Sequence, residues 1–245
     1  MSDLEMMRAQ QRAVEADAIA AQTGEMDEGL RAYMLSVYNY MTIGLALTGL
    51  FAFGVSRSPE LMNLIYTTPL QWVLIFGTLG MVFFFAAKVH TLKPATAQAI
   101  FWAYAALNGV TLSAIFVIYT GESLTQVFLI SAAMFGSLSL FGYTTKRDLS
   151  GMGKFLFMGL IGLVVASIAN LFIGSSVLQF AVSVIGVLVF AGLTVYDTQK
   201  IKSEYWYHAN AEDAQRGAIR GALHLYLDFI NLFLMMLRLF GTTRD

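Results

Sequence analysis

Two acidic residues, Asp197 and Asp228, lie in stretches that otherwise have the composition of membrane-spanning helices. An ionised side chain at the bilayer centre costs a helix about 2.5–3.5 kcal/mol on insertion scales, so such residues are rare and usually mark a functional site. The other acids lie in the N-terminal tail or in predicted loops and helix ends. We therefore expect the function to depend on this pair.

Two carboxyl groups held together away from water cannot both stay ionised cheaply, and a single proton can be shared between them. A shared proton would clasp the two helices, whereas its loss would leave two like charges that repel or bind a cation. Carboxylate oxygens are ligands that suit Ca²⁺. The pair is thus a candidate pH sensor and gate for a cation, with Asp197 and Asp228 as the metal ligands. Alternatively, Asp197 is an ordinary acid at the wet end of its helix, beside Lys200 and Lys202.

His224, Asp228 and Asn231 follow one another at spacings of four and three residues, which places them on one face of a helix. Such a polar stripe should face the bundle interior or water and not lipid. His224 could hold or relay the proton of Asp228, or form a simple interhelical hydrogen bond. If the last helix begins at Ile219, Asp228 lies roughly 13 Å along it, whereas Asp197 is near a helix end. The carboxyl groups then meet only if one helix extends further than its apolar stretch.

The elements that must position these residues are predicted to be membrane helices. The chain is 57% hydrophobic and 13% charged, against about 45–50% and about 25% in soluble domains. Each of seven apolar segments is close to the roughly 20 residues that cross a bilayer as a helix. The bilayer disfavours strands, because their edges would stay unpaired in lipid. The predicted fold is an all-α bundle with spans at 33–55, 70–90, 95–119, 123–143, 154–174, 177–201 and 219–240.

Punctuating residues separate these spans, at Ser58-Pro59, Lys93-Pro94, Thr120-Gly121, Ser150-Gly151 and Gly174-Ser175-Ser176. Two small-xxx-small pairs, Ala132 with Gly136 and Gly217 with Gly221, permit close helix approach, although we favour ordinary packing glycines as their interpretation. The polar stretch 204–216 resembles an interfacial loop at headgroup level.

Charge predicts the orientation. Twelve of the fifteen Lys and Arg residues fall on one side of a seven-span topology, and three, Arg57, Arg238 and Arg244, fall on the other. The richer side is expected to be cytoplasmic, which puts the N-terminus inside and the C-terminus outside. The twelve residues on the richer side are Arg8, Arg12, Arg31, Lys88, Lys93, Lys146, Arg147, Lys154, Lys200, Lys202, Arg216 and Arg220. In the alternative topology the last segment is re-entrant and only six segments cross, which puts Arg238 and Arg244 on the cytoplasmic side.

Residues 1–30 are polar and acidic and have no apolar core, so they are not a secretory signal peptide. We interpret them as a mobile cytoplasmic tail, with residues 31–245 as the transmembrane domain. Cysteine is absent, which excludes disulfides, thiolate metal sites and cysteine nucleophiles. The net charge of −1 gives no reason to expect a nucleic-acid partner. The lipid bilayer is the expected surrounding, and no cofactor is expected.

Four segments resemble the transmembrane BAX inhibitor motif family in its bacterial branch: FGSLSLFGYTTKRDLSGMG (135–153), YDTQKI (196–201), LYLDFINLF (225–233) and LRLFG (237–241). The resemblance covers nearly all of residues 30–241. It implies a seven-helix bundle with the last helix at the centre, in the bacterial inner membrane. It also implies that Asp197 and Asp228 are the di-aspartyl pH sensor of a Ca²⁺ leak.

One feature departs from that family. Its bacterial leak channel carries an arginine at the inner end of helix two that latches onto the helix-six aspartate, and no arginine occurs there in this chain. Lys88, His90 or Lys93 are the available substitutes, and lysine lacks the bidentate geometry of arginine. Some bacterial members look instead like partners of a membrane-bound AAA protease, so a regulator of such a protease or of a stress response is the alternative function.

A third hypothesis is an intramembrane aspartyl protease, in which two carboxyl groups activate water. The second aspartate of such enzymes follows Gly-x-Gly, which lets a substrate backbone approach. Here Leu225, Tyr226 and Leu227 precede Asp228. We therefore expect a protein that is not an enzyme.

Overall fold

The structure is a computed structural model that describes the backbone of residues 3–244 and the side chains of residues 28–244. Over this range it is an all-α bundle with seven helices long and apolar enough to span a membrane, which confirms the predicted fold class. Its helices are α1 (Asp3–Ser56), α2 (Pro59–Thr67), α3 (Leu70–Lys88), η1 (Val89–Thr91), α4 (Pro94–Leu112), α5 (Ile115–Ile118), α6 (Gly121–Thr144), α7 (Ser150–Ile173), α8 (Ser176–Glu204), η2 (Tyr205–Tyr207) and α9 (Ala211–Phe240).

Side-chain caps explain where several helices begin. The hydroxyls of Ser58, Thr120 and Ser175 accept hydrogen bonds from backbone N–H groups in the first turns of α2, α6 and α8. These hydroxyls satisfy donors that a helix start leaves free. Gly174 ends α7 with φ of 66°, a left-handed conformation that glycine adopts without strain. The predicted breaks therefore coincide with real helix ends.

The last helix begins earlier than its apolar stretch suggests. The side chain of Asn210 accepts a hydrogen bond from the N–H of Asp213 (2.9 Å), and this cap starts α9 at Ala211, eight residues before Ile219. The polar stretch 204–216, predicted to be a loop, is therefore largely helical. Helix α8 also continues past Ile201 to Glu204.

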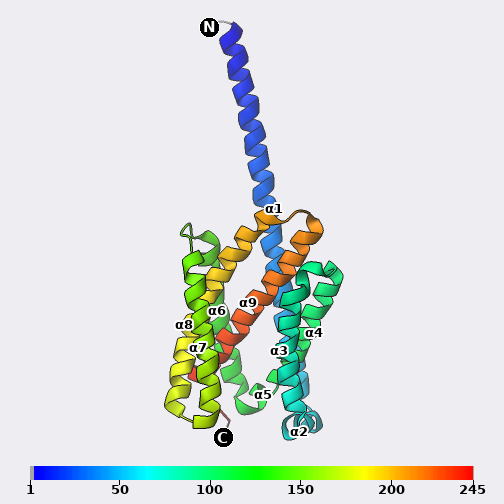
Figure 1. Cartoon of the computed structure of the whole chain (residues 1–245), viewed down its shortest axis with the longest axis vertical. Helices are drawn as coiled ribbons and strands as arrows, with labels where there is room; N and C mark the ends of the chain where they lie inside the picture. Colours follow the sequence, from blue (N-terminus) through cyan, green and yellow to red (C-terminus); the bar gives the residue numbers. More distant parts are fainter. Residues whose placement is uncertain (1–2, 245) are drawn as a thin grey trace.

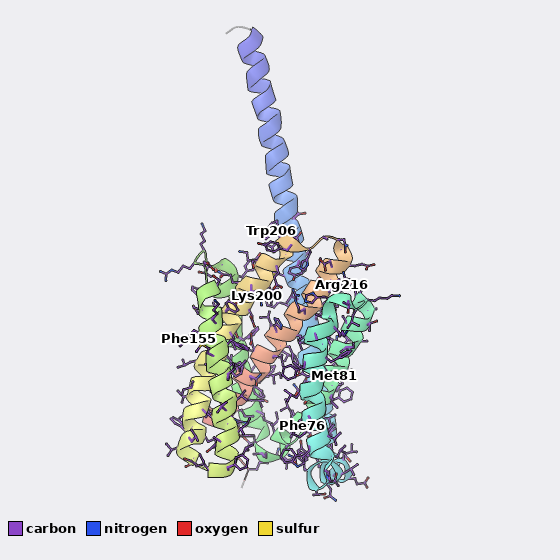
Figure 2. The ribbon with its side chains drawn as sticks, viewed as in Figure 1. Phe76, Met81, Phe155, Lys200, Trp206 and Arg216 are labelled. Atoms are coloured by element: carbon purple, nitrogen blue, oxygen red, sulfur yellow. The ribbon has the colours of Figure 1, made fainter. Side chains whose placement is uncertain are left out.

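Helix α9 lies at the centre of the bundle and crosses it diagonally (Figure 1). In its membrane window 61% of the residues are buried, against 33% or less in each of the other six spans. It packs against α1, α4, α6 and α8, while α3 and α7 lie further out against α4 and α8. Outer side chains such as Phe76 of α3 and Phe155 of α7 are exposed, as the lipid-facing side of a span should be (Figure 2).

Hydrogen bonds anchor α9 at its middle and at its end. The Tyr226 hydroxyl bonds with Thr48 of α1 (2.7 Å) and accepts from Asn108 of α4 (2.8 Å). Beyond the helix, the N–H of Thr242 donates to Ser123 of α6 (2.8 Å). Because α1, α4 and α6 each hold α9, its central position is fixed by polar contacts as well as by apolar packing.

The two ends of the bundle are called here the N-terminal side, where α1 enters, and the C-terminal side, where α9 ends (Figure 1). The connections 88–94, 144–150 and 204–211 lie on the N-terminal side. The first half of α1 projects from it, well beyond the bundle. The predicted acidic tail falls on this projection, and because its side chains up to residue 27 lie outside the described ones, its mobility and its cytoplasmic location stay predictions.

Helix backbones approach most closely at two glycines outside the predicted pairs, whereas Gly221 of the second pair packs against the side chain of Ile201 in α8. A Cβ atom on Gly109 would collide with the carbonyl oxygen of Thr48, and one on Gly142 with that of Val195. By contrast, a Cβ on Gly136 would meet nothing within 4 Å. The α1–α4 and α6–α8 contacts therefore depend on Gly109 and Gly142, whereas the Ala132–Gly136 pair lines an open surface.

We predict that Gly142→Ala destabilises the protein by about 1–3 kcal/mol, because the added methyl group forces α6 away from α8. Gly136→Ala, on the same helix, is the matched control and should change stability by less than about 0.5 kcal/mol. Reversible unfolding in detergent measures both. Equal effects of the two substitutions would contradict the assignment of Gly142 as the close-approach residue.

Candidate functional site

Asp197 and Asp228 meet at the interface between α8 and α9. The two helices run antiparallel and share the most extensive helix–helix contact in the described part of the chain. The structure brings the carboxyl groups within hydrogen-bonding range of each other. Asp228 is only 5% exposed, whereas Asp197 is half-buried. The two carboxyl groups can meet because α8 extends to Glu204, and because α9 starts at Ala211 and crosses the bundle at a tilt.

One oxygen of the pair has no donor. Asp228 Oδ2 is fully buried and accepts no hydrogen bond from any described side chain or backbone group. Two ionised carboxylates can only accept, so contact between them is a hydrogen bond only when one acid carries a proton. A buried carboxylate without a donor pays a large desolvation cost. The arrangement therefore favours the form in which the pair holds one proton.

A cavity of about 640 Å³ surrounds the pair, between α7, α8 and α9. It contains the whole predicted polar stripe, since His224 and Asn231 line it together with both aspartates. The Asn231 amide donates to the carbonyl of Leu227 in its own helix (2.8 Å). Three basic side chains, Lys154, Lys200 and His224, also line this cavity. The rest of the wall is mainly apolar and comes from Phe157, Leu160, Phe190, Leu193, Tyr196 and Leu227.

Lys88 and His90 are not brought to the pair. Neither lines the cavity that holds the two aspartates. His90 of η1 instead contacts Arg220 of α9, with 2.9 Å between its Nε2 and the Arg220 Nη1. Lys93 is exposed at the start of α4. None of the three predicted substitutes for a helix-two latch therefore touches Asp197.

Arg220 links three elements on the N-terminal side of the bundle. Besides His90, it contacts Glu204 at the end of α8, where its Nη2 donates to Oε2 at 2.6 Å. Both side chains of this ion pair are about three-quarters buried, with 20% and 26% exposure. A short, largely buried contact between an arginine and a carboxylate is a strong charge-assisted hydrogen bond. It closes the α8–α9 interface on the N-terminal side of the two aspartates.

The comparisons with known proteins agree with this architecture. A family model described as "Inhibitor of apoptosis-promoting Bax1" matches residues 30–245. The chain belongs to the Bax inhibitor-1 like family. As a family member with seven spanning helices, it is a multi-pass membrane protein.

Three relatives illustrate the breadth of this family in bacteria. The inner membrane protein YbhL of Escherichia coli (strain K12) is 47% identical over 219 residues, which cover 88% of this chain and 94% of the relative. An uncharacterized protein of Rickettsia prowazekii is 48% identical over 89% and 93% of the two chains. An uncharacterized membrane protein of Streptococcus pyogenes is 42% identical over 89% and 95%.

The family member holds no ready-made metal cage in its described part. No group of three or more histidine or acidic side chains among residues 28–244 could hold a metal ion. Two carboxyl groups offer at most about four oxygens, whereas Ca²⁺ takes about 6–8 ligands. A Ca²⁺ ion at the pair would therefore keep much of its water shell, which fits a passing ion better than a resident one.

Sequence reasoning missed Glu204 and Arg220, although a signal for them exists. Glu204 follows Asp197 by seven residues and Arg220 precedes Asp228 by eight, which is about two helical turns in each case. Because α8 and α9 are antiparallel, the register that brings Asp197 beside Asp228 also brings Glu204 beside Arg220. The signal becomes readable only once α9 is known to start at Ala211 and not at Ile219.

We predict that Arg220→Gln or Glu204→Gln destabilises the protein by about 1–3 kcal/mol, because each leaves a partly buried charge without its partner. The double variant should lose less than the sum of the two, which a double-mutant cycle detects. Glu212→Gln is the matched control, since Glu212 is 77% exposed and lies 3.8 Å from Arg216. It should cost less than about 0.5 kcal/mol, and additive losses at 204 and 220 would contradict the pairing.

Proposed function

We propose that this protein is a pH-sensitive leak for cations, with Ca²⁺ as the permeant ion and the Asp197–Asp228 pair as its gate. The observation that carries the proposal is the meeting of two carboxyl groups inside the membrane domain, one of them with a buried oxygen that no donor satisfies. Intramembrane ionisable groups commonly mark ion pathways and proton relays.

In the closed form one proton is shared by the pair and acts as a clasp between α8 and α9. His224, one turn before Asp228, is placed to exchange that proton with the cavity. The Glu204–Arg220 ion pair holds the same two helices together two turns away. Closure thus uses two contacts between α8 and α9, the shared proton and an ion pair that does not involve it.

Loss of the proton opens the gate. Two adjacent carboxylates repel each other strongly in a medium of low dielectric constant. They relieve that repulsion by separating or by binding a cation, and both responses favour passage of Ca²⁺. The sign of the pH dependence follows directly, because raising the pH removes the proton and therefore increases the leak.

The location of the protein is part of this proposal. The name of its relative YbhL supports the inner membrane of a bacterium. The excess of lysine and arginine on the N-terminal side supports a cytoplasmic N-terminus and a periplasmic C-terminus. A gate between α8 and α9 would then separate the cytoplasm from the periplasm.

Proteolysis by the aspartate pair is disfavoured. An aspartyl protease needs the substrate backbone to approach beside its carboxyl group. Here α9 is a continuous helix through Asp228, and the preceding Leu225 and Tyr226 are fully buried. We propose that the protein is not an enzyme and needs no cofactor.

A second candidate function is regulation of a membrane-bound protease or of a stress response. Its support is the projecting part of α1, which stands clear of the bundle on the N-terminal side and has no role in the proposed gate (Figure 1). An acidic helix of this kind could bind a partner in the cytoplasm. This role is compatible with a leak, and the two are tested separately.

We predict that Ca²⁺ flux into reconstituted vesicles rises across a series of increasing pH, by at most about tenfold per unit because one proton is released. Asp197→Asn and Asp228→Asn should each abolish this dependence and keep the flux low, since the amide can donate to the remaining carboxylate without a titrating proton. A fluorescent Ca²⁺ indicator inside the vesicles measures the flux.

The matched control for that experiment is Asp148→Asn. Asp148 lies in the 144–150 connection, outside the membrane, and its carboxyl accepts a hydrogen bond from the backbone N–H of Ser150 (2.9 Å). This bond lowers the pKa of Asp148, so the acid stays ionised throughout the series. Its loss should leave flux and pH dependence unchanged. The gate proposal fails if both aspartate variants also leave them unchanged.

For the second candidate, we predict that deleting residues 2–26 abolishes recovery of a membrane-bound AAA protease in a pull-down while Ca²⁺ flux persists. A variant with the acids of this segment replaced by Gln or Asn keeps the length and separates the effect of charge from that of the helix. If the protease is recovered equally with the deletion, the regulatory role loses its support. If flux disappears as well, the tail belongs to the channel.

A further inference from the structure

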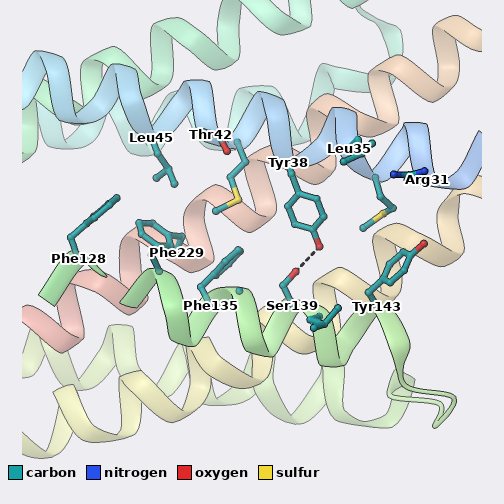
Figure 3. A pocket seen from close by; sticks show the side chains of 15 residues that line it. Arg31, Leu35, Tyr38, Thr42, Leu45, Phe128, Phe135, Ser139, Tyr143 and Phe229 are labelled. Atoms are coloured by element: carbon teal, nitrogen blue, oxygen red, sulfur yellow. Dashed lines mark hydrogen bonds between the residues drawn. The ribbon is translucent and has the colours of Figure 1, made fainter. Parts of the chain in front are cut away.

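A long groove runs along the membrane face of the bundle between α1 and α6, with α9 as its floor (Figure 3). Its volume is about 690 Å³. The two helices stand apart here, and the Tyr38 hydroxyl bridges them to Ser139 Oγ at 2.6 Å. A smaller cavity of about 220 Å³ shares Leu45, Phe128 and Phe229 with the groove and extends it toward the C-terminal side.

The groove is lined almost entirely by apolar side chains. Its floor holds buried residues such as Met41, Phe135 and Phe229, and its open edges hold Leu35 and Leu140, which are more than half exposed. In water such a surface would be a liability, but along spanning helices the surrounding medium is hydrocarbon. The species that reaches this groove is therefore a lipid chain.

Two of the hydroxyl groups that line the groove, those of Tyr38 and Ser139, are already hydrogen-bonded within the protein. Thr198 donates to the carbonyl of Thr194 (2.7 Å), so its contact with Ser139 (2.9 Å) must use the hydrogen of Ser139. The bond between Tyr38 and Ser139 then uses the hydrogen of Tyr38. The hydrogens of Tyr38 and Ser139 both point inward toward α8, so neither is left to donate to an occupant. The wall therefore suits an apolar chain better than a polar ligand.

The length of the groove fits one leaflet. Arg31 lies at its N-terminal end and Leu45 fourteen residues further along α1, which is about 21 Å of helix. Half of a typical bilayer is about 20–22 Å thick including its headgroup layer. The groove thus extends from headgroup level to about the midplane, as a single phospholipid does.

The charges at the groove are one-sided. Arg31 is exposed at the N-terminal end, and no acidic residue is among the fifteen that line the groove. Next to it, Lys202 Nζ donates to the carbonyl of Tyr143 (2.8 Å) and lies 4.7 Å above the ring of that tyrosine. A cationic and aromatic rim over an apolar groove is complementary to an anionic headgroup with its acyl chain below.

We infer that this groove is a binding site for an anionic glycerophospholipid of the leaflet on the N-terminal side. One acyl chain lies between α1 and α6 against Phe135 and Phe229, and the phosphate pairs with Arg31. The site is separate from the cavity of the two aspartates, on the opposite side of α9, and it does not depend on the proposed ion leak.

The test uses the full-length protein in phosphatidylethanolamine vesicles that contain a phosphatidylglycerol with a photoreactive group on its acyl chain. After illumination, labelled peptides are mapped by mass spectrometry. We expect labels concentrated on residues 34–45 of α1 and 128–140 of α6, and lost on addition of unlabelled phosphatidylglycerol. A phosphatidylcholine probe with the same chain should label these segments about fivefold less, the preference that one basic residue near an anionic lipid provides.

Two substitutions with matched controls make the test specific. Gly136→Phe should place a ring in the groove, since a Cβ at this position meets nothing within 4 Å, and should abolish the concentrated labelling. Gly162→Phe on α7 has the same open surroundings outside the groove and should leave the labelling unchanged. Arg31→Gln should remove the preference for phosphatidylglycerol, whereas Lys93→Gln, on the same side of the bundle, should keep it.

Uniform labelling of all lipid-facing helices, unchanged by Gly136→Phe, would overturn the inference, because it describes ordinary surrounding lipid. A second copy of the chain seated in the groove would also overturn it. That outcome would appear as α1–α6 cross-links between molecules and as a dimer that Gly136→Phe dissociates. If Gly136→Phe fails to fold, the loss of headgroup preference in Arg31→Gln decides the question.

Discussion

The contact between the Asp197 and Asp228 carboxyl groups constrains the whole bundle. A buried carboxyl group in a membrane domain must be neutral, paired or wet, because the cost of an isolated charge exceeds what a helix interface can offset. Asp228 is nearly inaccessible, so α9 can occupy only a position enclosed by other helices. The central place of the last helix and its partnership with α8 both follow from this requirement.

The same helix presents different chemistry on its different sides. Asp228 faces the cavity between α7 and α8, while the next residue, Phe229, forms the floor of the groove between α1 and α6. Tyr226 turns toward α1 and α4, where it is hydrogen-bonded. Because α9 is held in its middle by Tyr226 and at its end by Thr242, the structure favours local separation at the aspartates over movement of the whole helix.

Much of the fold could be predicted from the sequence, because lipid imposes strong and local rules. Composition and capping residues predict the span lengths and breaks such as Gly174. The polar stripe of His224, Asp228 and Asn231 follows from helical spacing alone. The start of α9 could not be read from hydropathy, since its first turns are polar, although Asn210 is a capping residue. The Arg220–Glu204 pair, the close approach at Gly142 and the open groove at Gly136 depend on which helices become neighbours. Local sequence does not record that information, which is why the two glycines look alike in the chain and differ in the structure.

The positions of the two α8–α9 contacts restrict how a gate between these helices can work. The ion pair between Arg220 and Glu204 lies about two helical turns from the aspartates and does not involve the shared proton. In the proposed gate, loss of the shared proton leaves the ion pair intact, so α8 and α9 remain joined near their connection while the carboxylates repel. Because α9 is also held at Thr242, the displacement proposed here is greatest between these two anchors, around Asp228 and Asn231. In this proposal a single proton controls the gate, because the competing forces act on two carboxyl groups in contact and not on the whole interface.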